Sequence, residues 1–163
     1  MKVVAIDPGY ERLGIAVLEK INGREKLLHS ECFRTSANFT HPQRLALIGE
    51  KIKKVVGEHK TEVLAVEKLF FSVNQKTALA VAEVRGIILY LAAANNLRVI
   101  EYSPTEIKIA VTGYGHSSKK QVAEMIKRLL MVKKKIIYDD EFDAIAVGLT
   151  FFAREKSDMA QQN

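Results

Sequence analysis

The stretch Val63-Leu-Ala-Val-Glu67 decides the fold, because four apolar residues in succession are followed directly by an acid. A short continuous apolar run of this kind predicts a strand that is buried on both faces, as in a parallel sheet. Before it, from His41 onward, apolar residues recur at helical spacing, and Pro42 stands where a first helical turn accepts proline. A helix that leads into a buried strand predicts a right-handed crossover, which places this strand beside the first strand of the chain.

The residues before this helix predict three consecutive antiparallel strands. Residues 2–7 form a short apolar run that also ends in an acid, and β-branched residues resume in residues 13–21. Asn22-Gly23 is a strong signal for a tight hairpin turn, so residues 26–35 can pair back on the preceding strand.

The residues after Glu67 predict helices that alternate with one more strand. The expected elements are a long helix over 74–95, a strand over 98–102, a short helix over 104–113, a helix from Ser117 or Ser118 to Met131, and a helix over 139–156. The fold class is therefore α/β, a mixed five-stranded sheet of three antiparallel strands and then two parallel ones, flanked by helices. We expect residues 1–156 to form a single domain and residues 157–163 to be a flexible C-terminal tail.

Composition narrows the class of protein. The chain has 163 residues, of which 48% are hydrophobic, which suits one globular domain. It has no apolar stretch long enough to cross a bilayer, and its N-terminus lacks the apolar core of a secretory signal. Its one cysteine, Cys32, cannot form an intramolecular disulfide. We expect a cytoplasmic protein with no membrane partner.

The positive charge is concentrated in one segment. Residues 103–135 contain eight basic and two acidic residues, and the rest of the chain is balanced, so the whole net charge of +6 lies in this segment. Such a distribution is typical of a surface that meets a polyanion. A solvated helix face explains a lysine cluster at least as well, so the charge alone does not identify a nucleic-acid site.

Four carboxylates are the candidate site. Asp7 and Glu67 end two strands that we expect to be parallel neighbours, so both should emerge at one edge of the sheet. Asp140 and Asp143, three residues apart, share one face at the start of the last helix. Adjacent carboxylates repel one another unless a cation intervenes. A set of oxygen ligands without thiolates or paired histidines suits Mg²⁺ or Mn²⁺.

Each acid also has a simpler interpretation. Acids in a first helical turn commonly complement the helix dipole, which explains Asp140 and Asp143 as well as Asp139 and Glu141. Asp7, followed by proline and glycine, also suits an ordinary turn. Glu67 is harder to explain in this way, because an acid directly after a fully buried strand is an unusual surface charge.

Five segments occur in order over nearly the whole chain. They are Ile6-Asp-Pro-Gly-Tyr-Glu-Arg-Leu-Gly14, Val66-Glu-Lys-Leu-Phe-Phe-Ser72, Val84-Arg-Gly86, Gly113-Tyr-Gly-His-Ser-Ser-Lys-Lys-Gln-Val122 and Asp140-Glu-Phe-Asp-Ala-Ile-Ala146. Together they resemble the RuvC family of bacterial Holliday junction resolvases. The Asp-Pro-Gly turn alone is weak, because it recurs in ribonuclease H-like and actin-like folds, but the five segments together are specific.

The resemblance implies a ribonuclease H-like fold, a homodimer, and an endodeoxyribonuclease that resolves four-way DNA junctions in recombination and DNA repair. It implies hydrolysis that leaves 5′-phosphate nicks and uses two Mg²⁺ ions per subunit, with Mn²⁺ as an alternative. The acidic tetrad of the family falls on Asp7, Glu67, Asp140 and Asp143. The third of these assignments is open, because acids also precede and follow Asp140.

The resemblance also implies residues that contact DNA. The basic residues of the family match Lys108 and Lys119, with Lys120 as an additional neighbour. The aromatic residue that wedges against bases at the crossover matches Phe70, and Phe71 either shares this task or packs in the core. Binding to the RuvA–RuvB branch-migration complex is a further partnership that the sequence leaves open.

The alanine-rich helix is the candidate dimer interface. Its apolar residues on nearby faces are Ala80, Val84, Ile87, Ile88 and Leu91. Packing of this helix on the sheet would explain the same pattern. One face of the helix can pack on the sheet while another forms the dimer interface.

Three other functions are alternatives to junction resolution. An actin-like or sugar-kinase ATPase begins with a similar turn but needs a second lobe, for which 163 residues leave no room. The RuvC-like nucleases of ribosomal RNA maturation are nearer, although they lack the phenylalanine-containing segment after the second acid. A junction-binding protein without catalysis is the third, and nothing in the sequence favours it.

Overall fold

The structure is a computed structural model that describes residues 1–68 and 75–161. Its elements are β1 (Lys2–Asp7), β2 (Arg12–Ile21), β3 (Arg24–Arg34), α1 (His41–His59), β4 (Val63–Glu67), α2 (Gln75–Ala94), β5 (Arg98–Tyr102), α3 (Pro104–Thr112), α4 (Lys119–Leu130) and α5 (Asp139–Gln161). These bounds lie within a few residues of those that the sequence predicts.

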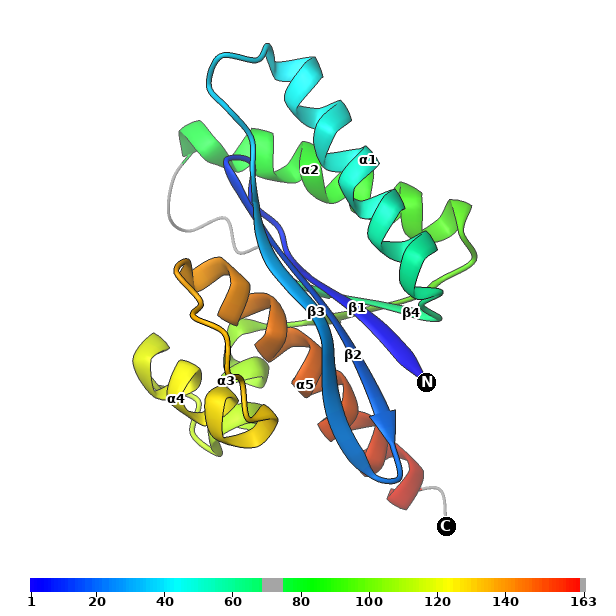
Figure 1. The fold of residues 1–163 in the computed structure, drawn as a ribbon, viewed down its shortest axis with the longest axis vertical. Coiled ribbons are helices and arrows are strands. Elements are labelled where there is room, and N and C mark those ends of the chain that lie inside the picture. Colours follow the sequence, from blue (N-terminus) through cyan, green and yellow to red (C-terminus); the bar gives the residue numbers. More distant parts are fainter. Residues whose placement is uncertain (69–74, 162–163) are drawn as a thin grey trace.

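The five strands form one mixed sheet in the order β3-β2-β1-β4-β5 (Figure 1). β1, β2 and β3 pair in antiparallel fashion, whereas β4 runs parallel to both β1 and β5. The predicted position of the Val63–Glu67 strand beside the first strand is therefore confirmed. In the register Val3 pairs with Val63 and Ile6 with Val66, so the acids that end β1 and β4 come to the same edge of the sheet.

Helices cover both faces of the sheet, α1 and α2 on one side and α3, α4 and α5 on the other (Figure 1). Alternation along the strands divides the side chains between the two faces. Toward α1 and α2 the central strands present large side chains such as Ile6, Ile15 and Val66. Toward α5 the same strands present small ones, notably Ala5 and Ala65.

The small residues allow α5 to lie very near the sheet. A Cβ atom on Gly14 of β2 would lie 2.0 Å from the carbonyl oxygen of Asp140, at the start of α5. A Cβ atom on Gly148 would lie 2.4 Å from Leu18 Cδ1 and 3.3 Å from the Cβ atom of Ala5. The contact at Gly14 is with backbone, so a side chain there would displace the start of α5, whereas a side chain at Gly148 would force the buried side chain of Leu18 to move.

Side-chain caps set the beginnings of the two helices beside the site. Ser103 and Ser118 precede α3 and α4, and each side chain accepts a hydrogen bond from the backbone three residues later. The side chains of Glu106 and Gln121 in turn accept a hydrogen bond from the backbone N–H of the capping serine, so both ends are complete capping boxes. The cap predicted at Ser117 or Ser118 is thus at Ser118.

The last helix is longer than expected. α5 continues to Gln161, so the backbone of residues 157–161 is helical where the sequence predicts a flexible tail. The segment contains no glycine or proline that would end a helix, which explains the extension. A single domain over residues 1–156 stays a prediction. No helix among the described residues is long and apolar enough to span a membrane.

Candidate active site

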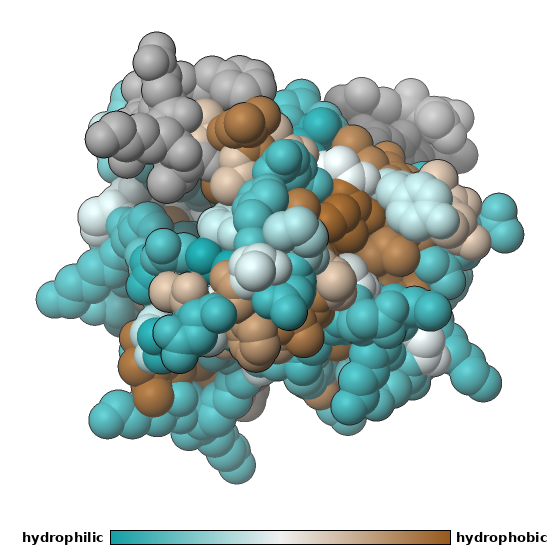
Figure 2. All heavy atoms as spheres, turned by 90° about the horizontal axis from the view of Figure 1, so that it is seen from above, coloured by the Kyte–Doolittle hydropathy of each residue, from teal (hydrophilic) through white to brown (hydrophobic). Residues whose placement is uncertain are grey.

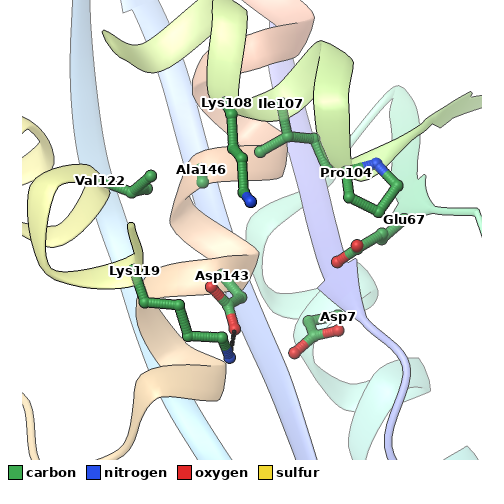
Figure 3. Close-up of a pocket in the computed structure, with 9 residues that line it drawn as sticks. All are labelled: Asp7, Glu67, Pro104, Ile107, Lys108, Lys119, Val122, Asp143 and Ala146. Carbon is green, nitrogen blue, oxygen red and sulfur yellow. Dashed lines mark hydrogen bonds and ion pairs between the residues drawn. The ribbon is translucent and has the colours of Figure 1, made fainter. Parts of the chain in front are cut away.

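Three of the four predicted acids line one cavity at the edge of the sheet. The cavity has a volume of about 320 Å³, and Asp7, Glu67 and Asp143 lie on its wall together with two lysines, Lys108 and Lys119. Figure 3 shows these side chains directed toward a common space. Pro104, Ile107, Val122 and Ala146 complete the lining. The carboxylates therefore face one another across a partly apolar hollow.

Strand periodicity explains why Asp7 and Glu67 meet there. Val3 and Ala5 belong to the core beneath α5, so Asp7, two residues further along β1, points to the same face. On β4 the same alternation runs through Val63 and Ala65 to Glu67.

Both strand-end carboxyl groups bind protons more tightly than ordinary acids. Burial raises the pKa of Asp7 well above its usual value, and the charges of Glu67, Asp143 and Asp140 add to the effect. Burial, followed by the charge of Asp143, raises the pKa of Glu67 to about 7. No described residue gives either side chain a hydrogen bond or an ion pair. The carboxyl groups of Asp7 and Glu67 thus have no direct cationic partner in the part of the chain that the structure describes.

Asp143, by contrast, is paired with a lysine. Lys119 Nζ lies 2.8 Å from Asp143 Oδ2 and 2.9 Å from Asp139 Oδ2, and Figure 3 shows the first of these contacts. Burial lowers the pKa of Lys119, but its hydrogen bonds to the two aspartates outweigh burial and raise the pKa above its usual value. The ammonium group therefore remains charged and screens the acids of α5.

Asp140 lies outside the cavity lining but acts on the same cluster. Its Oδ2 atom is buried and 3.3 Å from Arg12 Nε, yet it accepts no hydrogen bond from any described residue. Burial is the main reason why the pKa of Asp140 is raised. Its charge in turn raises the pKa of Asp7. Asp140 is thus electrostatically part of the site.

The two acids that flank Asp140 have different surroundings. The hydrogen bond from Lys119 is the main reason why the pKa of Asp139 is lowered. Glu141 is buried and turned toward β3, where Ser30 Oγ donates a 2.7 Å hydrogen bond to it and Lys134 forms an ion pair. Of these three acids, Asp140 is the one whose charge is among the main causes that raise the pKa of Asp7. The geometry therefore favours Asp140 over its neighbours as the third acid.

The donor set fits a divalent cation. Within residues 1–68 and 75–161, no three potential ligands are yet arranged closely enough to hold a metal ion. The cluster nevertheless offers only carboxylate oxygens as ligands. The pKa values of Asp7 and Glu67 are both raised. In addition, the buried Oδ2 atom of Asp140 accepts no hydrogen bond from the described residues. A hard cation would relieve all three features.

The predicted DNA-binding residues are placed differently. Lys108 and Lys119 line the cavity, whereas Lys120 is exposed at the start of α4 and outside the lining. Phe70 and Phe71 lie outside the described residues. The sequence reasoning missed Arg12, which pairs with Asp140, although Arg12 belongs to the first of the five segments and could have been singled out there.

Comparison with known proteins gives a consistent result. The family model described as "Crossover junction endodeoxyribonuclease RuvC" matches residues 3–151. A relative of that name from Carboxydothermus hydrogenoformans is 40% identical over 154 residues, which cover 94% of this chain and 97% of the relative. A second, from Moorella thermoacetica, is 42% identical over 149 residues, covering 91% of this chain and 89% of the relative.

Solved structures agree with these sequence matches. A Thermus thermophilus RuvC in complex with a Holliday junction substrate is 33% identical, with a TM-score of 0.87 and coverage of 96% of both chains. The yeast mitochondrial Holliday junction resolvase Ydc2 is 13% identical, with a TM-score of 0.69, over 93% of this chain and 77% of that one. The likeness to Ydc2 shows the fold alone.

Proposed function

The chain belongs to the RuvC family, and on this premise we propose that it is a structure-selective endodeoxyribonuclease that resolves four-way DNA junctions in recombination and repair. The fold is ribonuclease H-like. One observation carries the proposal: the carboxylates of Asp7, Glu67 and Asp143 converge in a cavity that two lysines also line. This combination can hold a cation and an anionic phosphate at the same place.

Hydrolysis by this family is metal-dependent. We assign Asp7, Glu67, Asp140 and Asp143 as the residues that hold the metal, which we propose to be two Mg²⁺ ions per subunit, replaceable by Mn²⁺. When bound, the cations supply an activated water and stabilise charge at the phosphate and on the departing 3′-oxygen. The products are nicks with 5′-phosphates. The raised pKa of Glu67 means that metal must displace protons from this group near neutral pH.

The remaining residues position the phosphate. Lys108 and Lys119 line the cavity and neutralise a phosphodiester that enters it. Ile107 and Val122 form an apolar wall, which lowers the local dielectric and strengthens those charge contacts. Lys119 already contacts Asp143, so it can shift between this carboxylate and the phosphate as the charge in the cavity changes.

The enzyme acts as a dimer on four-way junctions. Two active sites related by a twofold axis match the pseudo-symmetry of a junction and allow paired cuts. We propose that α2 contributes to the interface. Val84, Ile88 and Ala92 pack inward on the sheet, while Leu79 and Tyr90 of the same helix are 70% and 71% exposed. Figure 2 views the end of the molecule that carries α1 and α2, where apolar side chains reach the surface among polar ones.

Four assignments stay predictions. Phe70 and Phe71 are proposed as aromatic contacts to DNA bases, and Lys120 as an additional phosphate contact. Docking to a RuvA–RuvB branch-migration complex is a proposed partnership. A cytoplasmic location follows only from the sequence expectations and from the DNA substrate.

The test compares three substrates. The full-length protein is incubated with a mobile four-way junction, a linear duplex of the same sequence and an RNA·DNA hybrid, each with and without Mg²⁺. We expect paired cuts in the junction alone, and only when Mg²⁺ is present. Preferential cleavage of the hybrid would instead favour another ribonuclease H-like nuclease, and tight binding of the junction without cleavage would favour a binding protein.

A further inference from the structure

A second polar hollow lies beside the carboxylates and is not used by the proposed chemistry. It has a volume of about 590 Å³ and lies at the end of β3 and the start of β2. We call it the arginine groove. Its polar lining consists of Arg12, Arg34, Thr35, Ser36, Arg44 and Tyr138, and Glu11 adds a carboxylate.

The groove adjoins the active site through one residue. Arg12 lines the groove, and its Nε atom lies 3.3 Å from Asp140 Oδ2. In the sheet, Asp7 pairs with Gly14 and Arg12 pairs with Arg34, so the groove opens at the edge where the carboxylates emerge. An elongated ligand that fills the cavity can therefore continue into the groove.

Arg44 is a buried cation that has no acidic partner among the described residues. Arg44 is only 7% exposed. Nε donates a 2.9 Å hydrogen bond to Thr35 Oγ1, and the guanidinium lies 3.9 Å from the ring centre of Tyr10. No carboxylate in the described part of the chain pairs with it. Because a buried charge is costly unless it is matched, an anion in the groove would stabilise this guanidinium.

Arg34 likewise has no acidic partner within residues 1–68 and 75–161. It stands directly opposite Arg12 on the neighbouring strand, where two like charges repel each other. Arg34 Nη1 donates a 2.8 Å hydrogen bond to the hydroxyl of Tyr138, and the guanidinium also lies over that ring. Asp139 and Asp140 form ion pairs with Arg12, and no carboxylate of the described residues forms one with Arg34. The guanidinium is therefore held in position without being neutralised.

We propose that the arginine groove binds a backbone phosphate of the junction DNA other than the one that is cleaved. Guanidinium groups bind phosphate oxygens in a forked geometry, and the hydroxyl of Ser36, which in the structure only accepts a hydrogen bond, can donate to the same anion. The contact holds the strand in register with the active site, since phosphate contacts position a protein on DNA. This inference rests on the proposed function.

The main test is the salt dependence of DNA binding. Binding of the full-length protein to a four-way junction is measured without divalent metal from 50 to 200 mM salt, for the wild type and for Arg34→Gln. One lost phosphate contact should reduce the slope of log affinity against log salt by about 0.9. Between 50 and 200 mM salt, the factor by which affinity falls should therefore be about 3.5 times smaller for Arg34→Gln than for the wild type.

Three variants separate charge from structure. Arg34→Lys keeps the charge and should keep the wild-type slope. Tyr138→Phe removes the hydrogen bond to Arg34 but no charge, so it should also keep the slope. Arg24→Gln is the matched control, because Arg24 is an exposed arginine at the opposite end of the same strand, β3. The proposal is overturned if Arg34→Gln keeps the wild-type slope, or if Tyr138→Phe or Arg24→Gln lowers it equally.

Uncharged methylphosphonate linkages in the DNA can show which phosphate contacts the arginine groove. Methylphosphonates are placed singly along the junction strands, and one position should weaken the wild type by several-fold while leaving Arg34→Gln unaffected. If no position behaves in this way, the groove does not bind a DNA phosphate. Cleavage by the wild type is measured in parallel with Mg²⁺. Absence of junction cleavage would count against the proposed function, whereas unchanged slopes with normal cleavage would count only against the groove.

Discussion

The two faces of the sheet differ in what their helices bring to the strand ends. On one face, α1 packs Ile48 and Ile52 against large strand residues, and the result is an apolar layer. On the other, α5 packs Ala144 and Ala146 against alanines. The first face holds its helix at the distance that large side chains require, whereas the second allows a much closer approach.

The closer approach is what creates the site. Because α5 begins next to β2, Asp140 and Asp143 reach the edge where Asp7 and Glu67 emerge. The α1 side has no equivalent, since α1 begins with a capping box at Thr40 and has no acid in its first turn. Small residues beneath a helix therefore determine which face of this sheet carries chemistry. The following substitutions test the contrast between the α5 face and the α1 face.

The largest effect is expected from the carboxylates. Asp7→Asn, Glu67→Gln and Asp143→Asn should each reduce Mg²⁺-dependent junction cleavage by more than the roughly 10- to 100-fold that loss of an outer-shell partner costs a metal site. Binding of the junction should survive or tighten, because less negative charge faces the phosphates. Asp140→Asn should behave in the same way. Near-wild-type cleavage by any of these variants would remove that residue from the site.

The second largest effect is expected for the pH dependence of stability, through Glu67. The pKa of Glu67 is raised from 4.5 to about 7 in the folded protein, so the folded state holds the proton more tightly than the unfolded chain. Without metal, the contribution of Glu67 to stability should therefore be fully present below pH 4.5 and be lost as the pH rises through about 7. Glu67→Gln should remove this decline and be more stable than the wild type at pH 8, by roughly 2 to 3 kcal/mol.

Urea unfolding between pH 4 and pH 8 measures this difference. Glu50→Gln is the control, because Glu50 is an exposed acid of α1 on the opposite face, and it should keep the wild-type profile. Parallel profiles for the wild type and Glu67→Gln would show that Glu67 does not titrate in this range.

A pair of glycine substitutions tests the close approach itself. Gly14→Ala places a Cβ atom against the carbonyl oxygen of Asp140, so it should cost about 1 to 3 kcal/mol of stability and displace the start of α5. Gly57→Ala in α1 meets no atom within 4 Å and should stabilise the protein by about 0.5 to 1 kcal/mol. Urea unfolding and junction cleavage are measured for both. Equal behaviour of the two variants would contradict the role assigned to the glycine in β2.

The smallest effect is expected from two lysine pairs. Replacing Lys119 and Lys120 with alanine should lower the salt slope of junction binding by about 1.8, for two phosphate contacts. The matched control replaces Lys53 and Lys54, two exposed lysines of α1, and should leave the slope unchanged. The hypothesis fails if the first double variant binds with the slope of the wild type.

Much of the architecture follows from local patterns in the sequence. The apolar run before Glu67, the hairpin at Asn22-Gly23 and the serine cap at Ser118 each predict a feature that the structure confirms. The shared sheet edge of Asp7 and Glu67 also follows, because strand alternation and the crossover rule need only short-range information. Local sequence patterns are therefore sufficient to name the candidate acids.

Only the tertiary structure decided how these acids are paired. Nothing local indicates that Lys119 spans Asp139 and Asp143, that Arg12 reaches Asp140, or that Arg44 lies buried with no acidic partner among the described residues. Backbone periodicity determines which way a side chain points, and sequence carries that information within a few residues. Distances between side chains on different elements depend on how closely those elements pack, and here the packing of α5 is set by small residues on another part of the chain, such as Gly14.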